Sequence, residues 1–97
     1  MPTYEWTAEF DRDHSQLTVE QRKAFRRAVQ KFVEDLVAGP RFRKSLRVKG
    51  LQRAAGIFEL TWAPDGRATF QFGEPVREGE VHVVWRRVGS HAVLDEA

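Results

Sequence analysis

Apolar and polar residues alternate over the first ten positions of the chain. The apolar residues are Tyr4, Trp6, Ala8 and Phe10, and the polar ones are Glu5, Thr7 and Glu9. Because the side chains of a strand point alternately to its two faces, this period of two is typical of a strand with one buried face. We expect an N-terminal strand here, followed by a polar connection over residues 11–16.

A helical pattern follows this connection. Thr18 and Gln21 have the spacing of a capping box, in which each side chain bonds to the other residue's backbone N–H. The apolar positions after it are Phe25, Ala28, Val29, Phe32, Val33 and Leu36. Their spacing of three and four residues places them in one stripe of a helix, and Gly39-Pro40 is typical of a helix end. The pattern predicts a long amphipathic helix between Thr18 and Gly39, with its basic residues on the outside.

Residues 41–53, with the sequence RFRKSLRVKGLQR, contain six basic residues and no acidic one. Their few apolar positions favour a short helix or an irregular basic arm. Gly50 favours a turn near the end of this arm.

The last third of the chain returns to a period of two. Alternation over residues 57–62, 68–72 and 81–88 predicts three strands, and Ala63-Pro64-Asp65-Gly66 has the composition of a tight turn between the first two. Three consecutive strands of this kind form an antiparallel meander. The N-terminal strand is expected to pair inside that sheet and to complete four strands.

We therefore predict one small α+β domain over residues 1–97, in which the long helix covers one face of the sheet. The helix stripe needs an apolar face to pack against, because a helix with one apolar side is stable only when that side is buried. The opposite face is expected to stay polar and open to solvent. Its residues are Thr61, Arg67, Thr69, Gln71 and Arg86.

The net charge of +2, from 16 Lys and Arg against 14 Asp and Glu, conceals an uneven distribution. Residues 21–53 contain eleven basic and two acidic residues, a local net charge of +9. The basic ones are Arg22, Lys23, Arg26, Arg27, Lys31, Arg41, Arg43, Lys44, Arg47, Lys49 and Arg53. This concentration favours an RNA or DNA backbone, or an acidic protein, as a partner over an ordinary solvated surface.

Several kinds of chemistry are disfavoured by what the chain lacks. It has no cysteine, which removes disulfides, thiolate nucleophiles and Cys-ligated zinc. His14, His82 and His91 are few and scattered, and the common nucleotide-binding and hydrolase motifs do not occur, so we expect no metal and no small-molecule cofactor. We also expect a cytoplasmic protein with no membrane partner, because there is neither a long apolar run nor a signal-peptide layout.

His91 follows the last predicted strand, shortly after Arg86 and Arg87. An imidazole beside cations that bind phosphate is able to act as a general acid or base near neutral pH. Its position alone also fits an ordinary surface histidine of the tail.

The order strand, helix, basic arm and three strands resembles the RelE/ParE toxin superfamily. The resemblance covers the chain from about Phe10 to Leu94 and rests on short motifs. They are Gly56-Ile57-Phe58-Glu59-Leu60-Thr61-Trp62, Arg67 before an aromatic strand, and Arg87-Val88-Gly89-Ser90-His91. The last motif is closest to the YafQ-like branch, and Glu59-Leu60 is also similar to HigB-like members.

The resemblance implies the toxin of a bacterial type II toxin–antitoxin pair, acting as a ribosome-dependent endoribonuclease (an mRNA interferase). RelE-like members cleave mRNA without a metal, by attack of a ribose 2′-OH on the adjacent phosphate. His91 matches the YafQ-like catalytic histidine, Asp65 matches a catalytic aspartate after a proline, and Arg67 matches a strand arginine that faces the substrate phosphate. Contacts to phosphate or RNA are expected from Arg86, Arg87, Arg43, Lys44, Arg47 and Lys49. The expected partners are a cognate antitoxin and, for a catalytic chain, the ribosome and mRNA.

The chain also departs from the YafQ-like pattern. Thr61 stands where that pattern has a histidine, the basic arm has no histidine, and the tail after His91 has no aromatic residue. Asp65 equally suits a structural position in the turn before Gly66. Two alternatives therefore stay open: a non-catalytic binding module of the same fold for RNA or a partner protein, and a ParE-like inhibitor of gyrase.

Overall fold

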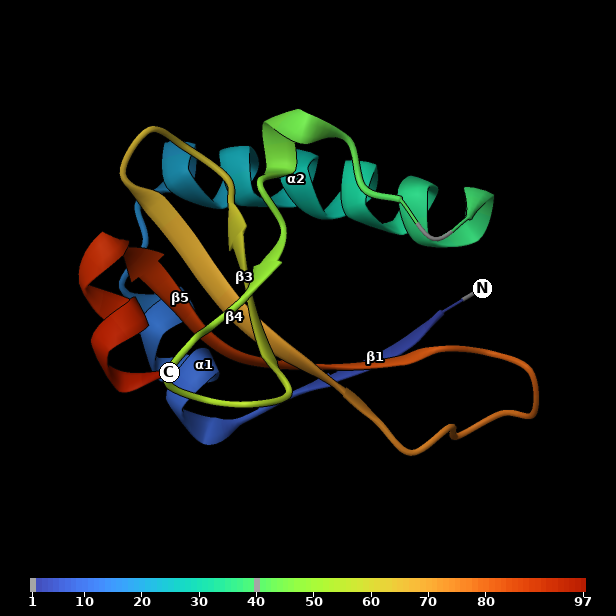
Figure 1. Ribbon diagram of the computed structural model, residues 1–97. Helices are drawn as coiled ribbons and strands as arrows, with labels where there is room; N and C mark the ends of the chain where they lie inside the picture. Colours follow the sequence, from blue (N-terminus) through green and yellow to red (C-terminus); the bar gives the residue numbers. More distant parts are fainter. Residues whose placement is uncertain (1, 40) are drawn as a thin grey trace.

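The computed structural model describes residues 2–39 and 41–97, in which one sheet carries helices on both of its faces (Figure 1). The helical elements are α1 (Ala8–Ser15), α2 (Val19–Ala38) and the 3-10 helices η1 (Lys44–Leu46) and η2 (His91–Glu96). The strands are β1 (Thr3–Trp6), β2 (Lys49–Gly50), β3 (Ile57–Thr61), β4 (Gly66–Gly73) and β5 (His82–Ser90). The predicted α+β class is confirmed, with a short fifth strand, β2, added to the expected four.

The strand order within these residues is β1-β5-β4-β3-β2. β3, β4 and β5 form the expected antiparallel meander, and β2 pairs with the outer side of β3. β1 runs parallel to β5, with Thr3 opposite His82 and Trp6 opposite Trp85. The expectation that β1 lies inside the sheet is therefore wrong. β4 already occupies one side of β5, so β1 takes the other side and becomes an edge strand.

The N-terminal strand also ends earlier than its alternation predicts. Thr7 is the N-cap of α1: its hydroxyl accepts a hydrogen bond from the Phe10 N–H at 3.1 Å and donates one to the Arg86 carbonyl at 2.9 Å. The polar connection expected over residues 11–16 is thus mostly a helix. Phe10 is nevertheless buried, as expected for the strand, because from the first turn of α1 its ring contacts Phe25 and Trp85.

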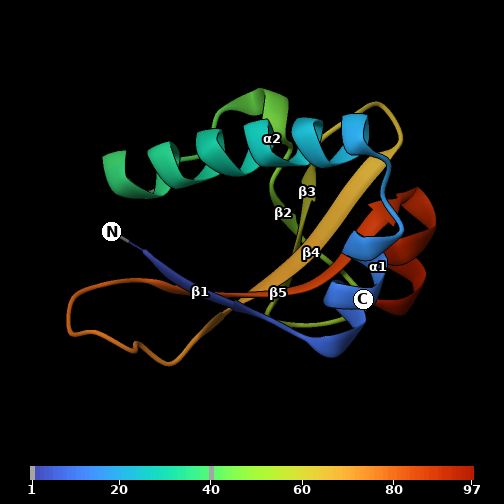
Figure 2. The same cartoon turned by 180° about the vertical axis from the view of Figure 1, so that it is seen from behind.

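α2 begins where the capping box predicts. Thr18 and Gln21 make both reciprocal bonds, at 2.8 and 3.1 Å, and the apolar stripe buries Phe25, Ala28 and Phe32. Figure 2 shows α2 lying across one face of the sheet. The strand side chains buried in the same core are Leu60, Ala68, Phe70, Val83, Trp85 and Val88. Gly39 caps the helix, and Pro40, the other half of the predicted stop, lies outside the described residues.

The opposite face of the sheet is less open than expected, because η2 packs on it. A Cβ built on Gly89 would lie 3.0 Å from a methyl group of Val93, which places η2 directly over β5. Thr69 is fully buried, and its hydroxyl has no hydrogen-bond partner among the described residues. The expectation of a fully solvated polar face is wrong for Thr69, since the tail folds back instead of extending into solvent.

None of the helices in the described part of the chain combines the length and the apolar character that crossing a membrane requires.

Candidate functional site

The pairing of β4 with β5 brings the three predicted catalytic residues to one end of the sheet. Gly66, the first residue of β4, lies opposite Ser90, the last residue of β5, and Arg67 lies opposite Gly89. Asp65 therefore precedes β4 at the point where His91 follows β5. Because paired strands are about 5 Å apart, the two residues leave the sheet from neighbouring positions.

Asp65 and His91 are both exposed, and within the described residues neither side chain has a hydrogen-bond partner. Asp65 belongs to the turn between β3 and β4, in which Gly66 N–H donates to the Ala63 carbonyl and Trp62 N–H donates to the Gly66 carbonyl. His91 is the first residue of η2, whose N-cap is Ser90. An exposed carboxylate and an exposed imidazole at the same strand ends can exchange protons with a bound ligand.

Arg67 donates hydrogen bonds to the backbone of the same turn. Its Nη1 donates to the carbonyls of Ala63, Pro64 and Gly66 at 3.4, 3.3 and 3.0 Å, and its Nε lies 3.9 Å from Oε2 of the buried Glu59. The Nη2 group has no acceptor among the described residues. Arg67 can therefore hold the turn with one arm of its guanidinium and present the other arm to an anion.

A cleft of about 470 Å³ adjoins this turn, between α2, η1 and the β3–β4 connection. Four cationic side chains line it, and they are Arg27 and Lys31 from α2, Arg47 from the residue after η1, and Arg67. Trp62 and Pro64 form part of the same wall. We call this the basic cleft. Its α2 residues were not among the expected contacts, although their i, i+4 spacing on the outer face of a helix is visible in the sequence.

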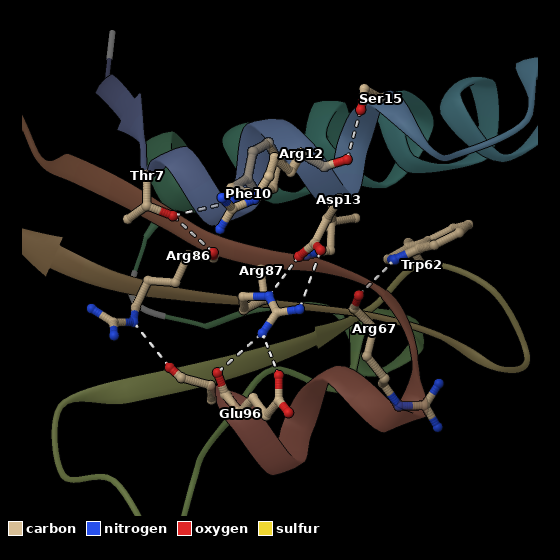
Figure 3. Close-up of polar contacts among 12 residues, drawn as sticks. Thr7, Phe10, Arg12, Asp13, Ser15, Trp62, Arg67, Arg86, Arg87 and Glu96 are labelled. Atoms are coloured by element: carbon tan, nitrogen blue, oxygen red, sulfur yellow. Dashed lines mark hydrogen bonds and ion pairs between the residues drawn. The ribbon is translucent and has the colours of Figure 1, made fainter.

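Arg86 and Arg87, two of the expected phosphate contacts, are held by the tail of the chain. Arg87 lies between Asp13 of α1 and Glu96 of η2, as Figure 3 shows, with Nε–Oδ2 and Nη1–Oε2 distances of 2.6 and 3.2 Å. The bonds to Asp13 raise the pKa of Arg87, so that it stays charged. Arg86 donates to Gln71 at 2.8 Å and to the Ala97 backbone oxygen at 3.2 Å.

The other expected contacts are dispersed. Arg43 binds Asp35 and Glu34 at the end of α2, with Nη2–Oδ1 and Nη2–Oε1 distances of 2.8 and 3.1 Å. Lys49 lies on β2, with its Nζ 3.6 Å from Glu59. Lys44 is exposed on η1, outside the lining of the basic cleft. Of the six expected contacts, the structure therefore places Arg47 alone in the cleft.

No three His, Asp or Glu side chains gather closely enough to hold a metal ion in the part of the chain that the structure describes.

Comparison with known proteins gives matches among solved structures. No protein-family model and no curated protein matches the sequence. A chain of the DinJ–YafQ toxin–antitoxin complex of E. coli is similar over 96% of both chains, with a TM-score of 0.67 and 13% identity. A copper-bound mutant toxin from Helicobacter pylori matches over 97% of this chain and 99% of its own, with a TM-score of 0.68 and 15% identity.

A third match is a chain of the toxin–antitoxin complex RelBE2 from Mycobacterium tuberculosis. It covers 92% of this chain and 96% of its own, with a TM-score of 0.52 and 24% identity. At such identities the likeness is one of fold, and at that level it confirms the predicted resemblance. The chain has the fold of the RelE-family toxins, YafQ among them.

Proposed function

We propose that this chain is the toxin of a type II toxin–antitoxin pair and that it cleaves mRNA on the ribosome. Its fold is that of toxins, and the matching structures include complexes of a toxin with its antitoxin. The observation that carries the proposal is the pairing of Gly66 with Ser90, because Asp65 and His91 then adjoin neighbouring strand ends, and Arg67 is the next residue of β4.

In the proposed reaction the scissile phosphate lies at this end of the sheet. The Asp65 carboxylate accepts the proton of the ribose 2′-OH, whose oxygen attacks the adjacent phosphorus. The His91 imidazolium donates a proton to the departing 5′-oxygen, and the Nη2 group of Arg67 stabilises the negative charge that builds on the phosphate. The products are a 2′,3′-cyclic phosphate and a 5′-hydroxyl end.

The test is cleavage of a message in a purified translation system, with the cut sites mapped by primer extension. We expect the wild-type protein to cut ribosome-bound message and His91→Ala to lower the rate by about 10²–10⁴-fold. The exposed His91 has no partner in the described structure, so His91→Ala should unfold at the wild-type urea concentration. Intact message with the wild-type protein on translating ribosomes would refute the proposal.

The antitoxin has a candidate surface away from this end of the sheet. A groove of about 410 Å³ runs between β1 and α2; its wall includes Phe25, Val29 and Val33, and Arg22 and Arg26 also line it. On β1, Tyr4 and Trp6 are more than half exposed and stack on each other at 5.8 Å. An antitoxin segment with alternating apolar and acidic side chains fits this groove and its charge.

A non-catalytic binding module is the second candidate function. It is favoured by the commitment of Arg86 and Arg87 to the tail, which leaves Arg67 as the one arginine close to Asp65 and His91 among the three arginines of β4 and β5 that were expected to contact phosphate. In this case His91→Ala has no effect on growth arrest after induced expression, whereas an enzyme loses its toxicity. Inhibited DNA supercoiling with intact message would instead identify a gyrase inhibitor.

A further inference from the structure

We propose that the basic cleft binds the sugar-phosphate backbone of single-stranded RNA next to the cleavage site. This inference rests on the proposed function and adds Arg27 and Lys31 of α2 to the residues that contact the substrate.

The cleft gathers cations from three separate parts of the chain. Arg27 and Lys31 are one helical turn apart on α2, Arg47 follows η1, and Arg67 comes from β4. The Arg47 backbone has φ +47°, the one positive φ of a non-glycine residue in the described chain, and its N–H donates to the Lys44 carbonyl. A left-handed conformation costs a residue with a Cβ about 1–2 kcal/mol, so the surrounding structure holds Arg47 in place against strain.

Three of the four cleft cations lack the acidic partners that neutralise their neighbours, whereas Arg67 lies 3.9 Å from Glu59. Glu34 and Asp35, the two acidic residues of the positive stretch, both bind Arg43 instead. In residues 2–39 and 41–97, no carboxylate lies within 4.0 Å of the charged groups of Arg27, Lys31 or Arg47. Cations that face one another without counter-charge repel, and a bound polyanion relieves that repulsion and releases counterions.

Two observations favour RNA over an acidic protein segment as the occupant. Trp62 is among the residues that line the wall, and an aromatic residue among cations is typical of sites for single-stranded nucleic acid. Pro64 and Arg67 line the cleft, and they flank Asp65 in the turn. An RNA strand lying in the cleft therefore passes next to the turn that carries Asp65.

The test measures binding without cleavage. The probe is a fluorescent decamer of 2′-O-methyluridine, which lacks the attacking hydroxyl, and its binding is followed by anisotropy at several salt concentrations. We expect Arg27→Glu/Lys31→Glu to weaken binding at least tenfold at low salt. Losing two phosphate contacts should make the slope of log K against log salt shallower by about 1.4.

The matched control is Arg12→Glu/Arg77→Glu, which reverses two exposed arginines outside the cleft and changes the net charge equally. We expect this control to bind within about threefold of wild type, since long-range repulsion between exposed charges is largely screened. Equal weakening in both double variants, or unchanged binding by the cleft variant, would overturn the inference. So would tighter binding of a polyglutamate decamer than of the RNA.

Urea unfolding of each variant separates lost binding from lost folding, and Arg27→Gln/Lys31→Gln provides a milder change that should weaken binding in the same direction. The outcome is independent of the nuclease proposal. If the decamer requires the cleft while wild-type protein leaves message intact, the cleft inference stands and the nuclease function fails. If message is cut but the cleft variant binds the decamer as tightly as wild type, the nuclease function stands and the cleft inference fails.

Discussion

Arg87 of β5 and Asp13 of α1 form a two-point ion pair, with Nε 2.6 Å from Oδ2 and Nη2 3.2 Å from Oδ1. The same carboxylate accepts the Val88 backbone N–H at 3.2 Å. Both side chains are about four-fifths buried. The pair therefore attaches the first helix to the last strand, close to the point where η2 begins.

Asp13→Ala should destabilise the fold by about 1–3 kcal/mol, because it leaves the Val88 backbone N–H without its acceptor and removes two of the hydrogen bonds of the partly buried Arg87 guanidinium, which keeps those to Glu96. The measurement is the free energy of unfolding from urea titration. Asp11→Ala is the control, since Asp11 is exposed on the same helix and makes no ion pair in the described structure. Equal stability of the two variants would show that the Asp13–Arg87 pair contributes nothing.

The α1 helix marks a limit of what the pattern along the chain predicts. Tyr4, Trp6 and Phe10 keep a period of two across Thr7, so the alternation does not reveal that the strand stops there. The stop comes from hydrogen bonds that Thr7 makes to Phe10 and to Arg86, the latter 79 residues away. In α2, by contrast, the capping box and the stripe are local signals, and the helix forms where they predict it.

The candidate site likewise depends partly on local signals and partly on long-range contacts. The turn before Gly66 is local chemistry, and once the hairpin forms, the strand register carries Asp65 to His91. The ion pairs of the cations, by contrast, join different elements of the fold. Arg87 pairs with Asp13 and Glu96, and Lys49 pairs with Glu59, so these contacts exist only in the folded chain. The distribution of positive charge along the chain therefore predicts a basic surface but not which of its cations remain available to an anion.

Asp35 should make stability depend on pH in the acid range. Its pKa lies below the ordinary value because the Arg43 side chain, and then the Arg43 backbone N–H, donate hydrogen bonds to its carboxylate. A lowered native pKa stabilises the fold above the unfolded-state pKa of about 3.9, and this contribution is lost as pH falls through the native value.

The measurement compares urea midpoints of wild type and Asp35→Asn from pH 7 down to pH 2. We expect the variant to be less stable at neutral pH, with the difference shrinking below about pH 4. Asp95→Asn, at an exposed position of η2, serves as the control for removing one surface carboxylate. A difference between wild type and Asp35→Asn that stays constant with pH would contradict the role given to Arg43.

Replacing Arg67 should lower the stability of the fold, whereas replacing His91 should not, although both residues are proposed to act on the substrate. Arg67→Ala removes the Nη1 bonds to three turn carbonyls and one cation near Glu59, so it should lower the free energy of unfolding by about 1–3 kcal/mol. His91→Ala should leave it unchanged. Arg67→Lys keeps the positive charge but not the several N–H donors of the guanidinium, so it should recover only part of the lost free energy of unfolding. An Arg67→Ala protein as stable as wild type would show that the turn does not need these bonds.

Gly66 has no room for a side chain beside Trp62. A Cβ there would lie 2.6 Å from two atoms of the indole ring and 2.9 Å from the Ala63 Cβ. Gly66→Ala should therefore destabilise the fold by about 1–3 kcal/mol, because the ring has to move and its Nε1 bond to the Arg67 carbonyl, 3.0 Å long, is strained.

The control for Gly66→Ala is Gly50→Ala, where the nearest atom to the new Cβ is 4.0 Å away and no clash results. A double-mutant cycle identifies the cause: in a Trp62→Ala background the Gly66→Ala penalty should fall by more than half, since the ring that causes the clash is gone. The penalty is measured as the free energy of unfolding in urea. An equal penalty in both backgrounds would mean that the close approach of the Ala63 Cβ, and not that of Trp62, excludes a side chain at Gly66. The Trp62 ring would then not be the group that fixes the turn carrying Asp65.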